Sequence, residues 1–274
     1  MAGRLVNNSA VRRVQGAIRV AAALCALGCA AARAAPHCAE TTVRETPYVV
    51  CRFDPKADDI RLFHAGPDGE PYRHFGRLNE ALHAHGERLL FAMNAGMFQA
   101  NRAPVGLYVE GGVTRRPINN RDCDGNFCLK PNGVFWLSAR GGAISAHVAA
   151  TEAYLDKAKD VRDATQSGPM LVIDGALHPK FNKDSTSVYR RNGVGVTAEG
   201  EIIFAISDAP VTFHAFATLF RDDLKVSNAL YLDGAISRLY STELGRNEPG
   251  AALGPIVGVV ASENRDQINE GETR

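Results

Sequence analysis

Short apolar runs recur along the chain, and they predict a protein built mainly from strands. The runs are rich in Val, Ile, Leu and aromatic residues and are bounded by Gly, Asp, Asn or Pro, as strands are. Several contain no polar position, which is typical of strands that are buried on both faces. The predicted strands are Tyr48–Phe53, Ile60–His64, Arg88–Met93, Val105–Glu110, Gly133–Leu137, Met170–Ile173, Gly193–Val196, Ile202–Ile206, Ala229–Leu232 and Pro255–Val260.

Three helices interrupt the predicted strands. The first, Arg77–His85, is followed by Gly86, and glycine commonly ends helices. The second, Thr151–Asp160, begins with a threonine that we expect to cap it. The third, Phe213–Leu224, carries apolar residues at helical spacing. Because strands outnumber helices and do not alternate regularly with them, the pattern predicts an α+β fold: a single domain with a mixed, strand-rich sheet flanked by a few helices.

The first 34 residues have the pattern of a secretory signal peptide. Four arginines precede the apolar run Val20–Ala32. This run of about 13 residues fits the apolar region of a signal and is shorter than the roughly 20 residues of a membrane-spanning helix. Small residues at Ala32 and Ala34 then provide a cleavage site. We expect a signal peptide over residues 1–34, a domain over residues 35–274 with its core at about 48–262, and a periplasmic or secreted location.

An N-terminal membrane anchor is the competing interpretation of this leader. Lipidation at Cys29 is a further alternative, which Ala26 disfavours because such signals usually carry leucine there. We expect no membrane span in the mature chain.

Removal of the leader changes the net charge of the protein. The leader contains five arginines and no acidic residue, which leaves 26 of the 31 basic residues against all 30 acidic residues, a net charge of −4. Nucleic-acid-binding domains carry a basic patch or a high isoelectric point. The charge therefore argues against nucleic acid as a partner.

Four cysteines remain after the leader is removed: Cys38, Cys51, Cys123 and Cys128. An even number of cysteines in an exported protein indicates disulfides. Proximity along the chain favours Cys38–Cys51 and Cys123–Cys128 among the three possible pairings. A zinc site is the alternative, but the sequence offers no matching pair of His or Cys residues nearby.

The usual enzymatic motifs are absent from the sequence, which has no Gly-x-Ser-x-Gly elbow, phosphate-binding P-loop or His-Glu-x-x-His motif. Instead, polar residues stand next to apolar strands at turns rich in glycine or proline. Each such turn alone is more often structural than functional. These segments are Phe91–Phe98, Ser167–Gly175, Tyr189–Val196, Ser207–Pro210 and Ala229–Arg238.

Taken together and in this order, the segments resemble the motifs of the phosphodiester glycosidase family. Asn94–Phe98 is similar to the family's Asn-Gly-Gly-Phe-Phe element, and Gly168–Leu171 to its Gly-Pro-x-Leu element. Arg191–Gly195 is similar to an Arg-Thr-Ala-x-Gly element, and Leu232–Ser237 to a Leu-Asp-Gly-Gly-x-Ser element. The departures from the pattern, which suggest a bacterial subgroup, are Ala95, Asn192 and Ala235.

The resemblance implies an exported hydrolase that cleaves the sugar C1–O bond of a sugar–phosphate diester, since a lysosomal member of the family removes N-acetylglucosamine from such a diester. The second pKa of a phosphomonoester is about 6, so it leaves without being protonated. A cation on the phosphate can then replace the acid that ordinary glycosidases need. We expect Arg191 to bind the phosphate, with Arg190 as second choice. Side chains alternate across a strand, so only one of the two faces the site.

A carboxylate must activate water or attack the sugar carbon, and Asp233 and Asp208 are the candidates because both follow apolar strands. A structural salt bridge between Arg191 and Asp233 is the alternative for that pair. The sequence defines no cofactor, although two carboxylates beside an anionic substrate would favour a divalent cation at Asp208 and Asp233. The expected substrate-binding residues are Asn94, Gly96, Ser167, Gly168, Arg190, Asn192, His214, Gly234 and Ser237.

Two other functions compete with the glycosidase. A metal-dependent phosphodiesterase would cleave P–O bonds and needs a cluster of carboxylate and His ligands, which the sequence does not assemble. A non-catalytic carbohydrate-binding or scaffolding domain of the cell envelope would need exposed aromatic platforms, yet the one tryptophan, Trp136, lies in a predicted core strand. We therefore expect a hydrolase whose partner is a phosphorylated glycan or sugar–phosphate diester.

Overall fold

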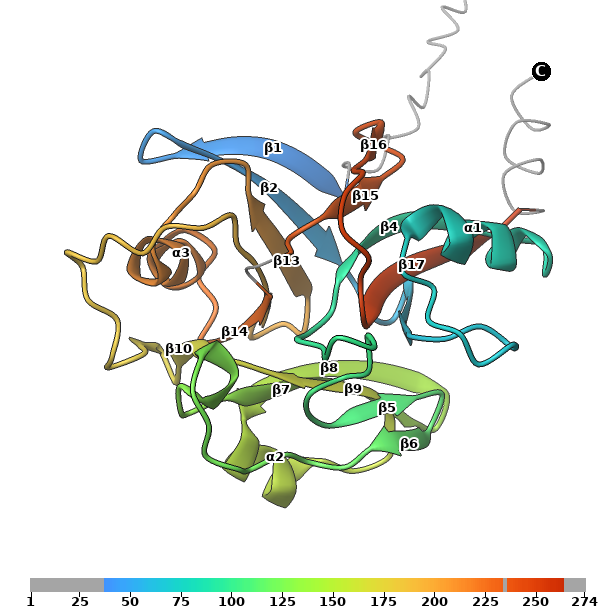
Figure 1. Cartoon of the computed structure of the whole chain (residues 1–274), viewed down its shortest axis with the longest axis horizontal. Coiled ribbons are helices and arrows are strands. Elements are labelled where there is room, and N and C mark those ends of the chain that lie inside the picture. The colour runs from blue at the N-terminus through green and yellow to red at the C-terminus, as the bar shows by residue number, and fades with distance from the viewer. Residues whose placement is uncertain (1–36, 234–235, 264–274) are drawn as a thin grey trace, which may run out of the picture. The chain divides into compact units, whose positions relative to one another are not determined.

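The structure of the protein is a computed structural model that describes residues 37–233 and 236–263. The predicted signal peptide, residues 1–34, and the predicted site residue Gly234 lie outside the described residues. Within them, no helix has the length and apolar character that a membrane crossing requires. The fold is α+β, as predicted, with many strands and few helices (Figure 1).

Three antiparallel sheets form the fold (Figure 1). The first sheet has the strand order β1-β2-β13-β12-β14-β10-β11. Its strands are β1 (Cys38–Val43), β2 (Thr46–Phe53), β10 (Met170–Ile173), β11 (Ala176–Leu177), β12 (Asn192–Val196), β13 (Ile202–Ser207) and β14 (Asn228–Asp233).

The second and third sheets have five strands each. The second, in the order β16-β15-β4-β17-β3, contains β3 (Asp59–Phe63), β4 (Glu87–Asn94), β15 (Leu239–Ser241), β16 (Arg246–Asn247) and β17 (Ile256–Ser262). The third, in the order β6-β5-β9-β7-β8, contains β5 (Tyr108–Glu110), β6 (Val113–Arg116), β7 (Gly133–Arg140), β8 (Ala143–Ala150) and β9 (Val161–Ser167).

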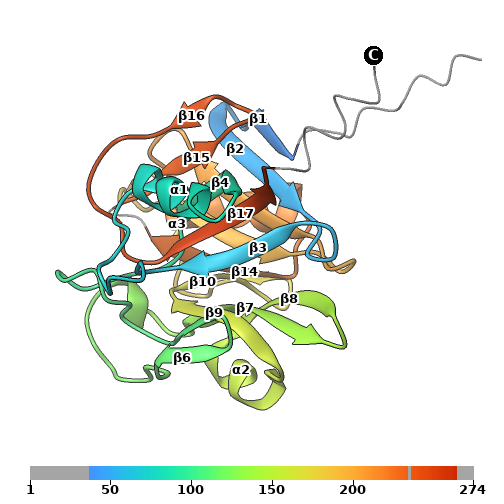
Figure 2. The ribbon, with the colours of Figure 1, turned by 90° about the vertical axis from the view of Figure 1, so that its right-hand side faces the viewer.

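Each helix packs on one sheet. Figure 2 shows α1 (Phe75–His83) beside β4 of the second sheet, and α2 (Thr151–Lys157) packs on β7 and β8 of the third. The third helix, α3 (Phe213–Thr218), continues into a short π-helical segment, Leu219–Asp223, and packs on β10 of the first sheet. A 3-10 turn, Asn126–Cys128, is the remaining helical element of the described chain.

The helix predictions are confirmed in position but not in every end. The first helix begins earlier than predicted, and Gly86 follows it in the left-handed conformation with φ +69°. Thr151 was expected to cap the second helix, but Ala150 occupies the cap position. The Thr151 hydroxyl instead donates to Oδ1 of Asn132 over 2.8 Å. This buried partner outcompetes the cap, because an unpaired hydroxyl is costly inside the protein.

The strand predictions are confirmed, with one difference in how the strands pair. Each predicted strand is present, and the structure adds β1, β6, β8, β9, β11, β15 and β16. A mixed sheet was expected, but every pair of neighbouring strands in the described part of the chain is antiparallel. Apolar runs alone do not distinguish parallel from antiparallel pairing when both faces of a strand are covered.

One aromatic cluster joins the three sheets. Phe53 and Phe204 come from the first sheet, Phe91 from the second and Phe135 from the third, and all four are buried. The ring centroid of Phe91 lies 4.9 Å from that of Phe53 and 5.2 Å from that of Phe204. Phe135 meets Phe204 edge-on at 6.0 Å. The core therefore sits where the sheets face one another.

The continuously apolar strands are buried on both faces, as predicted. On β13, Ile202, Phe204 and Ile206 face the core shared by the three sheets. Ile203 and Ala205 face a second cluster that includes Phe216 and other residues of α3. Alternate residues of one strand thus fill two different clusters, which explains why the run contains no polar position.

Both predicted disulfides are present. Cys38–Cys51 joins residues that pair across β1 and β2, with a Cα–Cα distance of 4.0 Å. Cys123–Cys128 closes a loop of five residue steps with a Cα–Cα distance of 5.3 Å. The two bonds therefore constrain chain segments of very different length.

Removal of the longer disulfide should destabilise the protein more than removal of the shorter one. A disulfide that closes a loop of about 15 residues contributes about 3 kcal/mol by restricting the unfolded chain, and a shorter loop contributes less. The double variant Cys38→Ala/Cys51→Ala should lose about this much in denaturant unfolding, and Cys123→Ala/Cys128→Ala less. A larger loss for the second variant would contradict the loop argument.

Candidate active site

Two buried asparagines join the predicted site segments. Asn94 ends β4 in the second sheet and Asn192 begins β12 in the first, and both are 0% exposed. The side-chain amide of Asn94 donates to Oδ1 of Asn192 over 3.1 Å, and that of Asn192 donates to the backbone oxygen of Asn94 over 2.9 Å. Because buried polar groups need partners inside the protein, this pair fixes the two strand ends against each other.

The same pair fixes the backbone around Asp233, the last residue of β14. The Asp233 amide donates to Oδ1 of Asn192 over 3.1 Å. Its carbonyl oxygen accepts from the Ser237 hydroxyl over 2.8 Å. The amide of Arg238 donates to Oδ1 of Asn94 over 3.0 Å. The backbone of Asp233 is therefore held at both its amide and its carbonyl.

The third sheet contacts the end of β14 through Ser167. This residue ends β9, is 0% exposed, and donates its hydroxyl to the carbonyl of Leu232 over 2.7 Å. Three sheets thus converge on the tip of β14. The predicted residues that the structure brings together there are Asn94, Ser167, Asn192, Asp233 and Ser237.

Glycine is required at Gly96 and Gly168 by the close packing of this region. A Cβ on Gly96 would lie 2.8 Å from Oγ1 of Thr165, whose hydroxyl donates to the carbonyl of Ala95. A Cβ on Gly168 would lie 2.7 Å from the Cβ of Asn132. Real Cβ atoms do not approach other atoms so closely. Both glycines therefore have a packing role that lets the segments meet.

Arg191 lies on the opposite side of β12 from Asn192 and is buried, with 1% of its surface exposed. Its guanidinium donates to the carbonyls of Val211 and Ser187 over 2.8 and 3.2 Å. A third bond, of 3.2 Å, goes to the phenol oxygen of Tyr231. The Phe213 ring centroid lies 3.6 Å from the guanidinium carbon. The guanidinium is therefore enclosed by the protein, and a direct grip on substrate phosphate would require this shell to open.

Tyr231 links Arg191 to Asp233. Tyr231 and Asp233 are two residues apart on β14, and the pairing of this strand with β12 shifts register between them. Burial raises the pKa of the Tyr231 phenol, while the positive charge of Arg191 lowers it and the negative charge of Asp233 raises it. The three acceptors of Arg191 are neutral oxygens rather than the carboxylate of a salt bridge. The Tyr231 phenol thus lies within electrostatic reach of both the Arg191 guanidinium and the Asp233 carboxylate.

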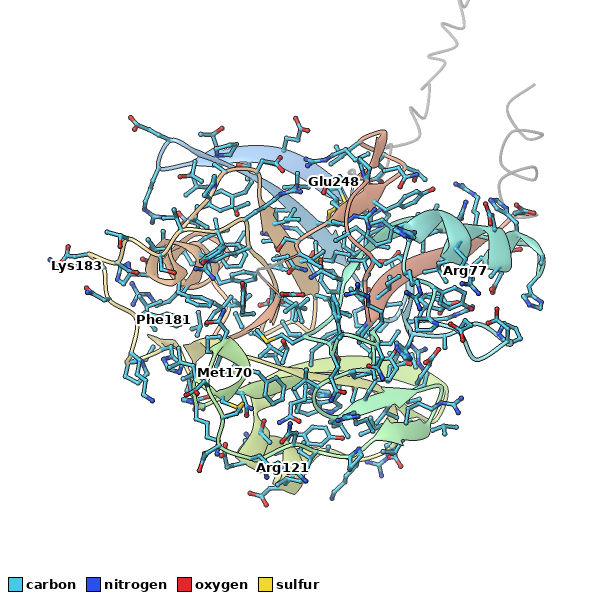
Figure 3. All side chains as sticks on the ribbon, viewed as in Figure 1. Arg77, Arg121, Met170, Phe181, Lys183 and Glu248 are labelled. Carbon is cyan, nitrogen blue, oxygen red and sulfur yellow. A yellow bond between two sulfur atoms is a disulfide. The ribbon has the colours of Figure 1, made fainter. Side chains whose placement is uncertain are left out.

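Asp208 and Arg190 belong to a separate ion cluster, which also contains Arg246 and Glu248. Arg190 donates to both Glu248 oxygens over 2.6 and 2.7 Å and to Asp208 over 2.8 Å. Arg246 donates to both Asp208 oxygens over 2.8 and 2.7 Å, and these bonds hold the pKa of that carboxyl below its usual value. The cluster, whose Glu248 is marked in Figure 3, leaves neither oxygen of Asp208 without a guanidinium partner. It ties the first sheet to β16.

His214 and the proposed metal site find no support in the geometry. His214 lies in the first turn of α3, and its carbonyl accepts from the Thr218 hydroxyl. Its ring makes no hydrogen bond to any described residue. No group of three His, Cys, Asp or Glu side chains within residues 37–233 and 236–263 is arranged to hold a metal ion. Both oxygens of Asp208 are engaged by Arg246, a divalent cation at Asp208 and Asp233 stays a prediction, and no chemical step is derived through one.

Several residues of the site region gave no signal in the sequence. Tyr231 was predicted only as a strand residue. Arg246 and Glu248 lie outside every motif, and their pairing with Arg190 and Asp208 bridges 38 to 58 positions of the chain. A groove of about 750 Å³, lined in part by Trp136 and His147, contains none of the predicted site residues.

Comparison with known proteins agrees with this geometry. The phosphodiester glycosidase family profile matches residues 87–260, which include all the segments that meet at Asp233. An uncharacterized protein of Escherichia coli K12, YigE, is 31% identical over 210 residues, which cover 76% of this chain and 79% of that protein.

Two solved structures share the fold. The zebrafish N-acetylglucosamine-1-phosphodiester alpha-N-acetylglucosaminidase catalytic domain, auto-inhibited by its pro-peptide, superposes with a TM-score of 0.55 at 15% identity and covers 81% of each chain. A hypothetical protein from Synechocystis gives a TM-score of 0.54 at 15% identity, over 82% of this chain and 61% of that one. The motifs, the family match and the shared fold together show that this chain belongs to the phosphodiester glycosidase family.

Proposed function

We propose that the protein hydrolyses the sugar C1–O bond of a sugar–phosphate diester and that Asp233 is the catalytic carboxylate. One observation carries the proposal: segments from three sheets, all within the family match, meet in a buried hydrogen-bond network around Asp233. Active sites need side chains held within a fraction of an ångström by a supporting shell. Asn94, Asn192 and Ser237 supply such a shell.

The leaving group of this reaction needs no protonation. Water attacks C1 of the sugar, and the C1–O bond breaks with its electron pair on the phosphate oxygen. Because a phosphomonoester has a second pKa of about 6, it departs without a general acid. Asp233 accepts the proton of the attacking water. One carboxylate therefore suffices where an ordinary glycosidase uses two.

Arg191 supports this reaction through its charge, without contacting the substrate. Its charge is buried beside Tyr231, and among residues 37–233 and 236–263 its guanidinium donates to three neutral oxygens rather than to a carboxylate. In a site of low dielectric constant, a fixed positive charge stabilises negative charge that develops nearby. The hydrogen bonds to Ser187 and Val211 also fix the segments that border the site. Arg191 is thus a positioning residue in this proposal, in place of the direct phosphate ligand expected from the sequence.

The same proposal includes export from the cytoplasm. The two disulfides support it, because disulfides form and persist mainly in oxidising compartments. The leader over residues 1–34 has the pattern of a signal peptide. N-terminal sequencing of the exported protein should find a start at or near Ala35.

Asp233→Asn should lower kcat on every substrate that the enzyme hydrolyses. Loss of a positioned general base typically costs about 10²–10⁴ in rate, and asparagine preserves the size of the side chain. Asp174→Asn is the matched control, because Asp174 also precedes glycine at the end of a buried strand but is exposed. Steady-state kinetics with a sugar–phosphate diester should show the loss in the first variant alone. Equal rates for the two variants would remove Asp233 from the mechanism.

Hydrolysis in oxygen-18 water should place the label on the released sugar. Attack at C1 gives the sugar the oxygen of water, whereas a phosphodiesterase gives it to the phosphate. Mass spectrometry of both products distinguishes these reactions. Label on the phosphate would establish P–O cleavage instead.

Arg191→Lys should lower stability and reduce activity on all substrates in parallel. Lysine keeps the charge, but its compact ammonium cannot bridge the three oxygens or stack on Phe213 as the planar guanidinium does. Loss of two hydrogen bonds of this kind costs about 2 kcal/mol, which denaturant unfolding measures. A diester and an aryl glycoside without phosphate should be affected alike. A loss confined to the diester would show direct contact with the phosphate.

A further inference from the structure

Three arginines line a groove that the proposed reaction does not use. Arg115 and Arg116 at the end of β6, and Arg121 in the segment that follows it, surround a space of about 360 Å³. Figure 3 shows Arg121 and Glu248, which belongs to the ion cluster, at opposite ends of the molecule in that view. The volume falls within the range of about 300–1,000 Å³ that is typical of small-ligand sites.

The groove carries uncompensated positive charge. No acidic residue is among those that line it. Within the described part of the chain, none of its three arginines forms an ion pair or a side-chain hydrogen bond, whereas other surface arginines such as Arg44 and Arg52 are paired with carboxylates. Guanidinium groups that donate no hydrogen bond within the protein are suited to bind phosphate oxygens in pairs.

The nearest carboxylates do not neutralise this charge fully. Glu110 on the neighbouring strand β5 is within electrostatic reach of Arg115, but burial raises the pKa of its carboxyl to about 7 against the opposing effect of that arginine. Asp122 pairs with Lys130 over 2.6 Å instead of with Arg121. A net positive potential therefore remains in the groove at neutral pH.

Asn119, which lines the groove, is anchored by a buried glutamine. Gln166 is 2% exposed, and its Oε1 accepts from the amides of Leu107 and Asn119 over 3.0 and 2.9 Å. Its amide donates to the Asn119 carbonyl over 2.9 Å. A Cβ on Gly106 would lie 2.5 Å from this Oε1, so glycine is required there. The segment that carries the arginines is therefore held rigidly to β9, one residue from Ser167.

The far side of the groove is also tied down. Asn119 donates its side-chain amide to the carbonyl of Val105 over 3.1 Å. Lys130 donates to the carbonyl of Asn120 over 2.9 Å, and the Cys123–Cys128 disulfide closes the loop that follows Arg121. Preorganised donors bind an anion at a smaller entropic cost than mobile ones. The loop disulfide thus helps to hold the groove in shape.

We propose that this groove is a separate anion-binding subsite, which takes a phosphoryl group on a sugar of the glycan substrate, away from the bond that is cleaved. The three arginines bind the phosphoryl oxygens, and Pro117, Ile118 and Val105 provide an apolar wall for the attached sugar ring. That the ligand is a glycan rests on the proposed function. The anion site itself rests on the groove alone.

Binding of a sugar phosphate tests the subsite directly. Titration calorimetry at low ionic strength would compare glucose 6-phosphate, methyl glucoside and inorganic phosphate as ligands. We expect the sugar phosphate to bind, the uncharged glucoside not to bind, and free phosphate to bind more weakly because it lacks the ring. Higher salt should weaken the binding, since it screens exposed charges. Free phosphate that binds as tightly as the sugar phosphate would overturn the glycan part of the proposal.

Two triple variants locate the site. Arg115→Gln/Arg116→Gln/Arg121→Gln should weaken the sugar phosphate by tenfold or more, about 1.4 kcal/mol for each factor of ten. The matched control, Arg140→Gln/Lys157→Gln/Lys159→Gln, removes the same charge from the groove of about 750 Å³ and should leave the affinity unchanged. Equal weakening in both variants, or none in the first, would overturn the subsite. Thermal unfolding confirms that both variants are folded.

Asp233→Asn separates this proposal from the proposed function. The variant should retain sugar-phosphate binding in the groove while it loses hydrolysis. If the protein hydrolyses no diester, the proposed function fails, but binding that depends on the three arginines still establishes the anion site. If Asp233→Asn abolishes the binding, the ligand occupies the catalytic site and the subsite is wrong.

Discussion

The position of Asp233 depends on the contact between two buried side chains, Asn94 and Asn192. Each amide spans the gap between two sheets, and neither has access to water. If Asn192 were replaced by an apolar residue, the Asn94 amide and the Asp233 backbone N–H would lose hydrogen bonds, and if Asn94 were replaced, the Arg238 backbone N–H would lose one. Each buried group left unsatisfied costs about 1–3 kcal/mol. The same hydrogen bonds therefore fix both the contact between the sheets and the position of the carboxylate. An asparagine at the end of β4 cannot move without moving the end of β14.

The sequence predicted the central strands of this region because they follow local rules. β13 and β14 were recognised by continuous apolar runs, which their double-sided burial explains. The polar residues at their ends converge because antiparallel neighbours bring Asn192 opposite Asp233. The strand β9 was missed, since its buried residues include Asp163, Thr165, Gln166 and Ser167. Their hydrogen bonds to distant segments make a polar strand an interior one, and no local pattern reveals such partners.

Arg190 and Arg191 show what the sequence alone cannot predict. Alternation along a strand correctly placed Arg190 and Arg191 on different sides. It could not tell which side is open, because that depends on Phe213, Tyr231 and the 187–189 segment, which fold over Arg191 from elsewhere in the chain. Burial without a carboxylate partner is costly for a charge. That the protein tolerates it beside the proposed reaction centre is itself an argument that the charge has a use there.

The ion cluster of Arg190, Asp208, Arg246 and Glu248 constrains how this protein can change. Two cations and two anions share at least six hydrogen bonds, so each member is balanced mainly by the other three. A single replacement leaves an odd charge in a partly dehydrated setting, whereas a coordinated exchange does not. In evolutionary terms the four positions are epistatic: the effect of substituting one depends on the identity of the rest. Homologues should carry the quartet together or have replaced it as a set, and libraries that vary its members singly would sample mostly defective proteins.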